Sequence, residues 1–550
     1  MRILCCVKPV PDTLVWDDAQ NSVVRSRALS INSADCGALS FALELKKSVG
    51  AEIIVLSMAP QSAGRILQDL FAVGADRIVL ISDAAFSGSD SLATAKILSA
   101  AAAKLGRFDL LLFGRRSSDG ETGHVAAQTA QLLHLPCITN AAGLSLSGDR
   151  LECTRLLENE TQTLSAALPC VVSVCGRHTL PPPSLSSLRD ARGKAAELLT
   201  NRELQLPGTE IGRSSQTFVF SSYPMQPPEA HGTFYSDAQE GARAIWLALQ
   251  TPPAALPRQS EAPELRRGRA AVVSLSADAP SAAAARELVG KVKTLYEHVT
   301  LFDCCSASAD DSVLAEAIAD AIRRAAPAAV LFPATIRGRS IAPLCAARLN
   351  AGLTADCTEL RLESGALSMI RPTFSGTLLA DIRSRSAPYL ASVRPGVFPA
   401  GAVEADAVVP VPAGAVGRVT LLRSISMSGG AEWNGRVILS GGRAIGGKGG
   451  FAALHALAAK LGARVCASRA AVDSGYAPYS CQVGQTGAAV RPQFYIALGI
   501  SGAVQHMAGI RGGALFAVNT DRKAPIFRYA DIGITAPWQD VVQALSGYCE

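Results

Sequence analysis

The chain has 550 residues, of which 49% are hydrophobic and 18% are charged, a composition typical of a globular protein with about three domains and not of a disordered one. The formal net charge of +6 is small for this length, and no basic run is interleaved with aromatic residues, which gives nucleic-acid binding little support. The 14 cysteines show no CxxC pair or metal-ligand spacing, and no run reaches the roughly 18 apolar residues of a membrane helix, so we expect a cytoplasmic protein with no metal site and no membrane span.

The first part of the chain alternates short strand-like runs with longer Ala- and Leu-rich helical runs. The predicted strands are residues 3–7, 52–57, 77–81 and 109–113. The predicted helices between them are residues 40–47, 63–71 and 91–105. Such βα repetition is typical of a parallel sheet with right-handed crossovers, and ligands then bind beyond the carboxyl ends of the strands.

This pattern stops in a proline-rich stretch and then starts again, with runs that correspond in order to those of the first half. The later predicted elements are residues 270–276, 299–302, 328–332, 341–349, 388–393 and 437–440. The predicted fold class is therefore α/β, with parallel-sheet Rossmann-like domains, two of them a pseudo-symmetric pair. We expect the divisions to be residues 1–250, a linker at 251–268, a second domain at 269–412 and a third at 430–550.

A series of polar and glycine-rich motifs marks the third domain, each where a strand is expected to run into a turn. They are Gly441-Gly442-Arg443, residues 468–473, residues 482–487, residues 501–506 and Asn519-Thr520-Asp521. In this order they resemble the FAD-binding segment of the alpha subunit of electron transfer flavoproteins. The resemblance implies a C-terminal FAD-binding domain after two adenine-nucleotide-type domains.

The resemblance also implies how FAD is held. A reduced flavin carries negative charge over N1 and its C2 carbonyl, and proteins stabilise it with nearby donors or cations. Arg469 is implied beside the isoalloxazine and Thr486 near its N5, while Gln505 and His506 face the C2 carbonyl side. At the adenosine end the family usually has Asp-Leu, where this chain has Pro537-Trp538. The other implied contacts are Arg443, Ser468, Gln482, Val483, Gly484, Gln485, Ser501, Gly502, Ala503, Val504, Asn519 and Trp538.

The first half resembles the beta subunit of the same family, which holds a buried AMP. The resemblance is carried by residues 7–13, 31–32, 72–76 and 118–123. Backbone amides of the turn at 119–126 are placed for a phosphate at the start of a helix. The residues implied for this first-half site are Cys6, Asn32, Asp35, Asp119, Thr122 and His124. His124 replaces a family Gln and Ser33 replaces the Pro of an Asn-Pro pair, and the alternative role of Asp119 is to cap a helix.

Residues 83–94 resemble a segment of beta subunits from anaerobic, electron-bifurcating members, in which a second FAD replaces AMP. This adds Asp90 and Thr94 to the first-half site. The second nucleotide is then FAD or AMP, with FAD favoured. The alternative is that Asp90 or Ser91 caps the following helix.

The proline-rich stretch at 180–189 occupies the place of the beta-subunit recognition loop, whose apolar anchor docks in the partner dehydrogenase. Leu185 is the implied anchor. The continuation at 190–194 differs from the lysine-rich sequence of the family, so the choice of partner can differ. The alternative is a proline-stiffened linker that binds nothing.

Together these resemblances imply both subunits in one chain, equivalent to a heterodimer. Such a protein shuttles electrons through FAD between an acyl-CoA dehydrogenase or related flavoenzyme and a redox acceptor, without catalytic residues of its own, or oxidises NADH if it is bifurcating. The rivals are an NAD-dependent dehydrogenase and an adenine-nucleotide sensor. The first lacks GxGxxG after the strand at 3–7, and the second leaves Arg469, Thr486 and His506 without a purpose.

Overall fold

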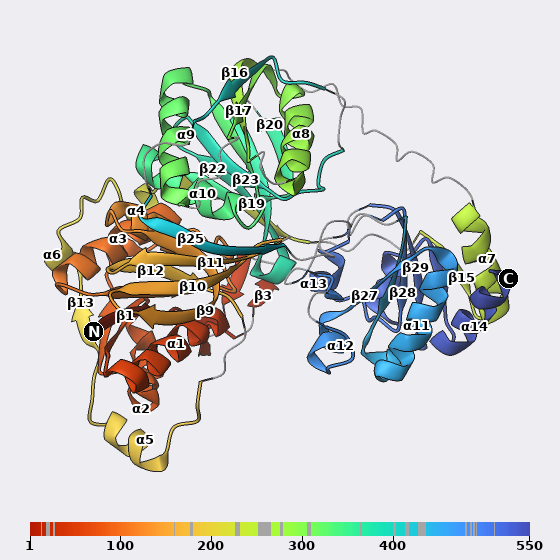
Figure 1. Ribbon diagram of the computed structural model, residues 1–550, viewed down its shortest axis with the longest axis horizontal. Coiled ribbons are helices and arrows are strands. Elements are labelled where there is room, and N and C mark those ends of the chain that lie inside the picture. The colour runs from red at the N-terminus through yellow and green to blue at the C-terminus, as the bar shows by residue number, and fades with distance from the viewer. Residues whose placement is uncertain are drawn as a thin grey trace. The chain divides into compact units, whose positions relative to one another are not determined.

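The computed structural model forms two compact units. Unit 1 consists of Met1–Tyr223, Pro263–Phe374 and Leu378–Ser428, and unit 2 of Pro224–Ala262, Ser375–Thr377 and Gly429–Glu550 (Figure 1). None of the described helices combines the length and apolar character needed to cross a membrane. The structure describes residues 1–549 except 13, 18–21, 26–27, 159, 177–179, 226–230, 251–265, 276–278, 305–309, 364–365, 400–402, 413–416, 427–435, 479–480, 485–486, 488–489, 491 and 511.

The first sheet of unit 1 has the strand order β13-β7-β6-β1-β8-β12-β9-β10-β11-β25. Its strands are β1 (Arg2–Cys6), β6 (Glu52–Met58), β7 (Arg77–Ile81), β8 (Leu110–Gly114), β9 (Cys137–Ser147), β10 (Arg150–Leu156), β11 (Glu160–Ala167), β12 (Cys170–Val174), β13 (Glu197–Leu199) and β25 (Val419–Ser426). Neighbours are parallel from β13 to β9 and antiparallel from β9 to β25. The parallel part is the sheet that the βα repetition predicts.

Helices cover both faces of this sheet, which is why its central strands are continuous apolar runs. On one side lie α1 (Ser33–Val49) and α2 (Gly64–Val73), and on the other α3 (Ser91–Lys104) and α4 (Val125–Leu132) (Figure 1). Two short helices follow β12, namely α5 (Leu185–Ala191) and α6 (Asn201–Leu204). Two small antiparallel pairs join β2 (Pro9–Pro11) to β5 (Leu29–Ile31) and β3 (Leu14–Asp17) to β4 (Ser22–Arg25).

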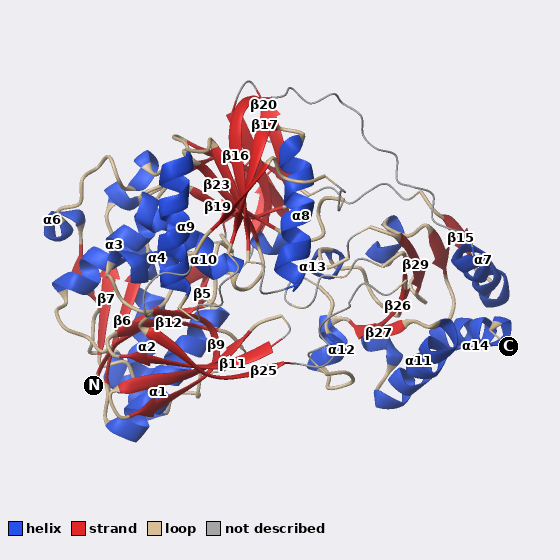
Figure 2. Cartoon of the chain, turned by 45° about the horizontal axis from the view of Figure 1, so that its top comes forward, coloured by secondary structure: helices blue, strands red, loops and turns tan. Residues whose placement is uncertain are grey.

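The second sheet of unit 1 is wholly parallel and has the order β19-β23-β18-β16-β17-β24. Its strands are β16 (Arg266–Ser274), β17 (Tyr296–Asp303), β18 (Ala329–Pro333), β19 (Leu353–Cys357), β23 (Tyr389–Val393) and β24 (Ala407–Pro410). Helix α8 (Ala279–Lys293) packs on one side, and α9 (Asp311–Ala325) and α10 (Gly338–Leu349) pack on the other (Figure 2). A smaller sheet joins β14 (Thr217–Pro224), β20 (Glu359–Glu363), β21 (Ala366–Thr373) and β22 (Leu378–Ser384).

The two large sheets repeat one topology, which confirms the predicted pseudo-symmetry. The order β6-β1-β8-β12-β9 of the first corresponds to β17-β16-β18-β23-β19 of the second. The corresponding strands β9 and β19 each carry a bulge, at Asn140 and Asp356, whose φ angles are 58° and 53°. The N–H of Asn140 donates to Ser173 Oγ at 3.3 Å, and the N–H of Asp356 donates to Ser392 Oγ at 3.0 Å. The duplication therefore extends to individual hydrogen bonds.

The two halves of unit 1 are joined by backbone and side-chain contacts. Strand β25, which follows the second sheet in the chain, pairs with β11 of the first, and α4 packs against α10. Between the halves, Arg155 is only 1% exposed and its Nη1 lies 2.7 Å from Asp311 Oδ2. A second guanidinium, that of Arg337, lies 3.0 Å from Asp311 Oδ1. The junction thus contains a buried charged group that depends on residues from both halves.

Unit 2 is built on a parallel sheet in the order β15-β30-β29-β28-β26-β27. Its strands are β15 (Thr233–Tyr235), β26 (Val437–Gly441), β27 (Arg464–Ala467), β28 (Phe494–Leu498), β29 (Ala514–Val518) and β30 (Ile532–Ile534). Its helices are α7 (Ala238–Gln250), α11 (Lys448–Leu461), α12 (Arg469–Asp473), α13 (Val504–Met507) and α14 (Trp538–Tyr548). Side chains of α7, α11 and α14 cover one face of the sheet.

One segment belongs to a different unit from the one that its place in the chain suggests. The expected first domain ran to residue 250, but β15 pairs with β30 and α7 packs on α14, with the rings of Trp246 and Tyr548 stacked 6.3 Å apart. Unit 2 is therefore assembled from three separated stretches of chain, of which the one at 375–377 is short. Most of the expected linker at 251–268 lies outside the described residues, and its last residues form the start of β16.

Candidate functional site

The carboxyl edge of the unit 2 sheet has the topology of a ligand-binding crevice. The chain passes from β26 to β27 on one side and then to β28 on the other, which makes a topological switch point at β26. The predicted FAD-contact motifs follow the carboxyl ends of β26, β27, β28 and β29. Strands remote in sequence thus bring the motifs to one edge.

Glycines allow the turns at this edge to pack backbone against backbone. A Cβ on Gly442 would lie 1.9 Å from Gly499 O, and one on Gly502, whose φ is 84°, would lie 2.3 Å from Ile526 N. The turn after β28 is held in place by Asn519, whose Nδ2 donates to Ile500 O at 2.9 Å. Asn519 therefore positions this turn within the protein.

The motif at 482–487 lies beside the end of β27. Gln482 forms a parallel bridge with Ala467, and the N–H of Val483 donates to Ala467 O at 2.9 Å. Gly484 packs against the backbone of Gln505, since an added Cβ would lie 3.0 Å from Gln505 O. This part of the motif therefore contacts α13. The other predicted residues of the motif, Gln485 and Thr486, lie outside the described residues, so their roles stay predictions.

The charged and polar side chains of these motifs divide into exposed and buried groups. The Arg469 side chain is 55% exposed and its Nε lies 3.6 Å from Asp473 Oδ2. Ser468 is buried and caps α12 by accepting from Ala471 N at 3.4 Å. Four other predicted residues at this edge are also exposed, namely Arg443, Ser501, Ala503 and Gln505. Partly buried Val504 begins α13, and partly buried Trp538 begins α14 after β30.

His506 is the predicted ligand whose surroundings best fit a bound flavin. It is 7% exposed, and its Nε2 lies 3.0 Å from the hydroxyl of Tyr495. Its Nδ1 is buried without a hydrogen-bond partner among the described residues. Burial lowers the pKa of the imidazole to about 4 against the opposing effect of the Val483 backbone, so the ring is neutral at physiological pH. A neutral imidazole with one unsatisfied nitrogen fits a polar acceptor or donor on a bound cofactor.

The first sheet of unit 1 has a second switch point, between β1 and β8. Asp35, at the start of α1, spans it by accepting from Lys8 N at 2.8 Å and from Gly114 N at 3.2 Å. Burial raises the pKa of Asp35 to about 7, against the opposing effect of these hydrogen bonds. The predicted residue Cys6, at the end of β1, is also buried.

Two more predicted residues of the first-half site hold its turns. Asn32 Nδ2 donates to Arg116 O at 3.0 Å, and Asn32 Oδ1 accepts from Ser118 N at 3.2 Å. Asp119 accepts from Lys8 Nζ with both oxygens, at 2.7 and 2.8 Å. Burial raises the pKa of Asp119, but the Lys8 ammonium and hydrogen bonds outweigh burial, so the pKa lies below its usual value. Asn32 and Asp119 therefore hold the start of the 119–126 turn, where a phosphate is expected, through bonds to other residues of the protein.

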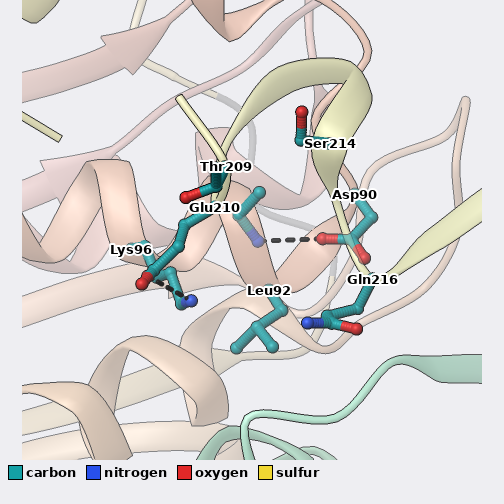
Figure 3. Close-up of a pocket in the computed structure, with 8 residues that line it drawn as sticks. Asp90, Leu92, Lys96, Thr209, Glu210, Ser214 and Gln216 are labelled. Carbon is teal, nitrogen blue, oxygen red and sulfur yellow. Dashed lines mark hydrogen bonds and ion pairs between the residues drawn. The ribbon is translucent and has the colours of Figure 1, made fainter. Parts of the chain in front are cut away.

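Asp90 has the capping role that the sequence left as its alternative. Its Oδ1 accepts from Ala93 N at 2.9 Å at the start of α3, and its Oδ2 accepts from the N–H and hydroxyl of Thr217, both at 2.8 Å. It lines a small hollow in which Lys96 pairs with Glu210 at 2.6 Å (Figure 3). Both Asp90 oxygens are therefore engaged by the protein. Thr94, one turn into α3, is partly buried.

His124 is fully buried at the start of α4, next to the partly buried Thr122. Its Nδ1 lies 3.4 Å from the Ser91 hydroxyl, while its Nε2 has no partner among the described residues. Burial, aided by the positive charges of Arg371 and Arg339, lowers its pKa to about 3. His124 is thus a neutral imidazole facing the second half of unit 1.

The sequence missed two residues that the fold brings into these sites. Lys8 was part of a motif, but its pairing with Asp119 connects positions 111 apart in the chain. Tyr495 lies in the apolar run Phe494–Leu498 of β28, which is typical of a buried strand, and only the turn that follows brings His506 back to it. Neither contact has a local sequence signal.

Leu185 is at the surface of unit 1. It is the first residue of α5, it is 87% exposed, and the helix is capped by Ser184, which accepts from Ser187 N at 3.1 Å. Helix α5 packs on α2, where Gln68 Nε2 donates to Lys194 O at 2.6 Å. A large apolar side chain is therefore presented to solvent on an anchored helix.

Comparison with known proteins agrees with this geometry. The electron transfer flavoprotein domain matches residues 20–201 and again 260–417, and the electron transfer flavoprotein FAD-binding domain matches residues 434–511. Relatives include electron transfer flavoprotein subunit alpha of Thermoanaerobacterium thermosaccharolyticum, 41% identical over 42% of this chain and 73% of its own length. The same subunit of Mycobacterium leprae is 42% identical over 38% and 67%, and protein FixB of Clostridium saccharobutylicum is 40% identical over 42% and 72%. The chain belongs to the electron transfer flavoprotein family, carries its FAD-binding domain, and has the function of an electron transfer flavoprotein.

Proposed function

We propose that this chain unites a beta-type and an alpha-type subunit in one polypeptide, and that it carries electrons between a flavoenzyme of the acyl-CoA dehydrogenase class and a redox acceptor. Two family domains followed by one FAD-binding domain support the fusion, as does the shared strand order of the two sheets in unit 1. Relatives named as subunit alpha match only 42% of the chain, which leaves the other half for the beta-type part.

The carrier role rests on the carboxyl edge of the unit 2 sheet. Bound FAD supplies one-electron transfer there. The observation that carries the proposal is that motifs from four strand ends lie at one edge of the sheet together with His506, whose Nδ1 is buried without a hydrogen bond in the described structure. Arg443 and Arg469 are exposed at the same edge and place positive charge near it. Fixed cations and donors at such a site stabilise the negative charge that builds on a flavin as it is reduced.

A second nucleotide is proposed for the switch point between β1 and β8. The buried Nε2 of His124 is an unsatisfied polar atom at the helix start that the family uses for phosphate. FAD here implies a bifurcating NADH oxidase, and AMP implies a simple carrier. The stretch at 83–94 supports FAD, whereas both carboxylate oxygens of Asp90 already bond to the protein. Asp90 therefore contributes to this site by holding α3 rather than through a free carboxylate.

Leu185 is the proposed anchor for the partner dehydrogenase. Its 87% exposure leaves nearly all of its apolar surface to be buried in a complex. Interface energy concentrates in a few such side chains, surrounded by contacts that matter less.

The test is to reconstitute the protein with excess FAD, remove unbound nucleotide, denature the protein and quantify FAD and AMP per chain. Two FAD support the bifurcating form, and one FAD with one AMP supports the simple carrier. Rapid mixing with a substrate-reduced acyl-CoA dehydrogenase should then reduce the flavin. A colourless protein after reconstitution refutes the carrier. NADH oxidation without bound flavin would favour an NAD-dependent dehydrogenase, and AMP as the sole nucleotide would favour a sensor.

A further inference from the structure

Tyr495 connects the core of the unit 2 sheet to the predicted flavin ligand His506. It lies on β28 and is 0% exposed, in a cluster with Ile438, Cys466 and Val483. Its hydroxyl is 3.0 Å from His506 Nε2, and the two ring centroids are 6.0 Å apart at an angle of 60°. The contact bridges the switch-point turn, because β28 ends before it and α13 begins after it. A core tyrosine thus fixes one side of the imidazole.

Both partners in this hydrogen bond are neutral. Burial raises the pKa of Tyr495 well above its usual value and lowers that of His506 to about 4, so the phenol keeps its proton and the imidazole carries only one. A neutral imidazole donates from one nitrogen and accepts at the other. If the phenol donates to Nε2, the imidazole proton lies on Nδ1. If Nε2 donates to the phenol, Nδ1 is a bare acceptor.

We propose that Tyr495 is a positioning residue for the flavin: its hydroxyl donates to His506 Nε2, keeps the ring in the Nδ1–H tautomer, and directs that N–H to an acceptor on FAD. This rests on the proposed placement of FAD at the carboxyl edge of the unit 2 sheet. The Nδ1 atom is buried and makes no well-aligned hydrogen bond to the described residues, and the backbone of Val483, which opposes the effect of burial on the pKa of the ring, is the protein group with which a flavin acceptor competes. An N–H donor stabilises a flavin oxygen more as negative charge builds on it, whereas a bare acceptor repels that charge.

Replacing Tyr495 with Phe separates this role from packing. The ring stays in the core with nearly the same volume, but Nε2 loses its donor and the imidazole can carry its proton on either nitrogen. Loss of one oriented hydrogen bond predicts that the affinity for reduced FAD falls about 2- to 10-fold more than that for oxidised FAD. The midpoint potential of the bound flavin falls accordingly. Tyr529→Phe is the matched control, because Tyr529 packs against the same cluster.

The experiment uses the full-length holoprotein, labelled with ¹⁵N-histidine, with His506→Gln to assign the signal. The flavin content is measured first, since a protein without FAD overturns the proposed function and this role with it. With FAD bound, the expected result is a protonated Nδ1 and an unprotonated Nε2 in the wild type, a mixed or reversed tautomer in Tyr495→Phe, and a lower potential in that variant alone. A wild-type His506 protonated on Nε2 overturns only the positioning role, even if Tyr495→Phe does not fold. If Tyr495→Phe folds and both its His506 tautomer and its flavin potential equal those of the wild type, the positioning role is overturned as well.

Discussion

Truncating the exposed leucine of α5 should impair docking and little else. Leu185 is 87% exposed, and full burial of a leucine side chain is worth about 1.5–3 kcal/mol, so Leu185→Ala should lose about 1.3–2.6 kcal/mol of encounter energy. That corresponds to roughly a 10- to 80-fold weaker complex. The free energy of unfolding should change by less than about 0.5 kcal/mol, because the side chain contributes little to the core. The bonds from Gln68 that hold α5 to the protein remain.

Stopped-flow mixing of the oxidised protein with a substrate-reduced acyl-CoA dehydrogenase, over a range of concentrations, measures this effect. The half-saturating concentration should rise, while the limiting rate of electron transfer and the flavin spectrum stay the same. Leu422→Ala is the matched control, since Leu422 on β25 is 52% exposed on another surface. Wild-type saturation by Leu185→Ala, or an equal loss in Leu422→Ala, would refute the assignment of Leu185 as the anchor.

Three further changes test the charged groups. Arg469→Ala should lower the flavin potential by the equivalent of about 1–2 kcal/mol, a small value because water screens a side chain that is 55% exposed. Arg464→Ala, at the amino end of β27, should leave the potential unchanged. Equal potentials of Arg469→Ala and the wild type on redox titration contradict this. Asp35, with a pKa of about 7, keeps in the folded state a proton that the unfolded chain releases near pH 4. The free energy of unfolding of the wild type should therefore fall by up to about 4 kcal/mol as the pH rises between these values, whereas that of Asp35→Asn should not. Urea unfolding at about pH 5 and pH 8 that changes equally in both proteins would falsify this. Arg155→Met should cost about 3–5 kcal/mol in denaturant unfolding, because Asp311 stays buried beside one other guanidinium, and a cost below about 1 kcal/mol would show that Asp311 does not need Arg155.

The parallel sheets were predictable because their strands are apolar runs with helices between them. The strand expected at 77–81 has those bounds in the structure. The helix expected at 40–47 begins seven residues earlier, at Ser33, since its first turns carry Asp35 and Gly37 over a polar switch point and so lack apolar periodicity. Pairing of β25 with β11 could not be predicted, because hydrophobic alternation does not identify a distant partner strand.

The candidate FAD site was predictable as a set of motifs but not as a network. Ser468, Gly502 and His506 were identified because their motifs, in this order, resemble the FAD-binding segment of electron transfer flavoproteins. Tyr495 was not, since a tyrosine inside such a run reads as core packing. The first-half site shows the converse: Asp35 and Asp119 were identified through the resemblance to the beta subunit, yet in the structure they bond to the protein's own backbone and to Lys8. Side-chain function at such positions depends on long-range contacts.

The presence of β15 and α7 in unit 2 has a consequence for dividing this polypeptide. A single cut between α7 and β16 would not release unit 2. Strand β15 would then belong to the N-terminal fragment, although it pairs with β30 of the C-terminal fragment. A fragment that started after Ser428 would leave the edge of β30 unpaired and uncover the side of α14 against which α7 packs. Unit 2 therefore needs segments from both sides of the linker. A gene divided at the linker would encode two chains, and unit 2 would be complete only after the two chains had bound to each other.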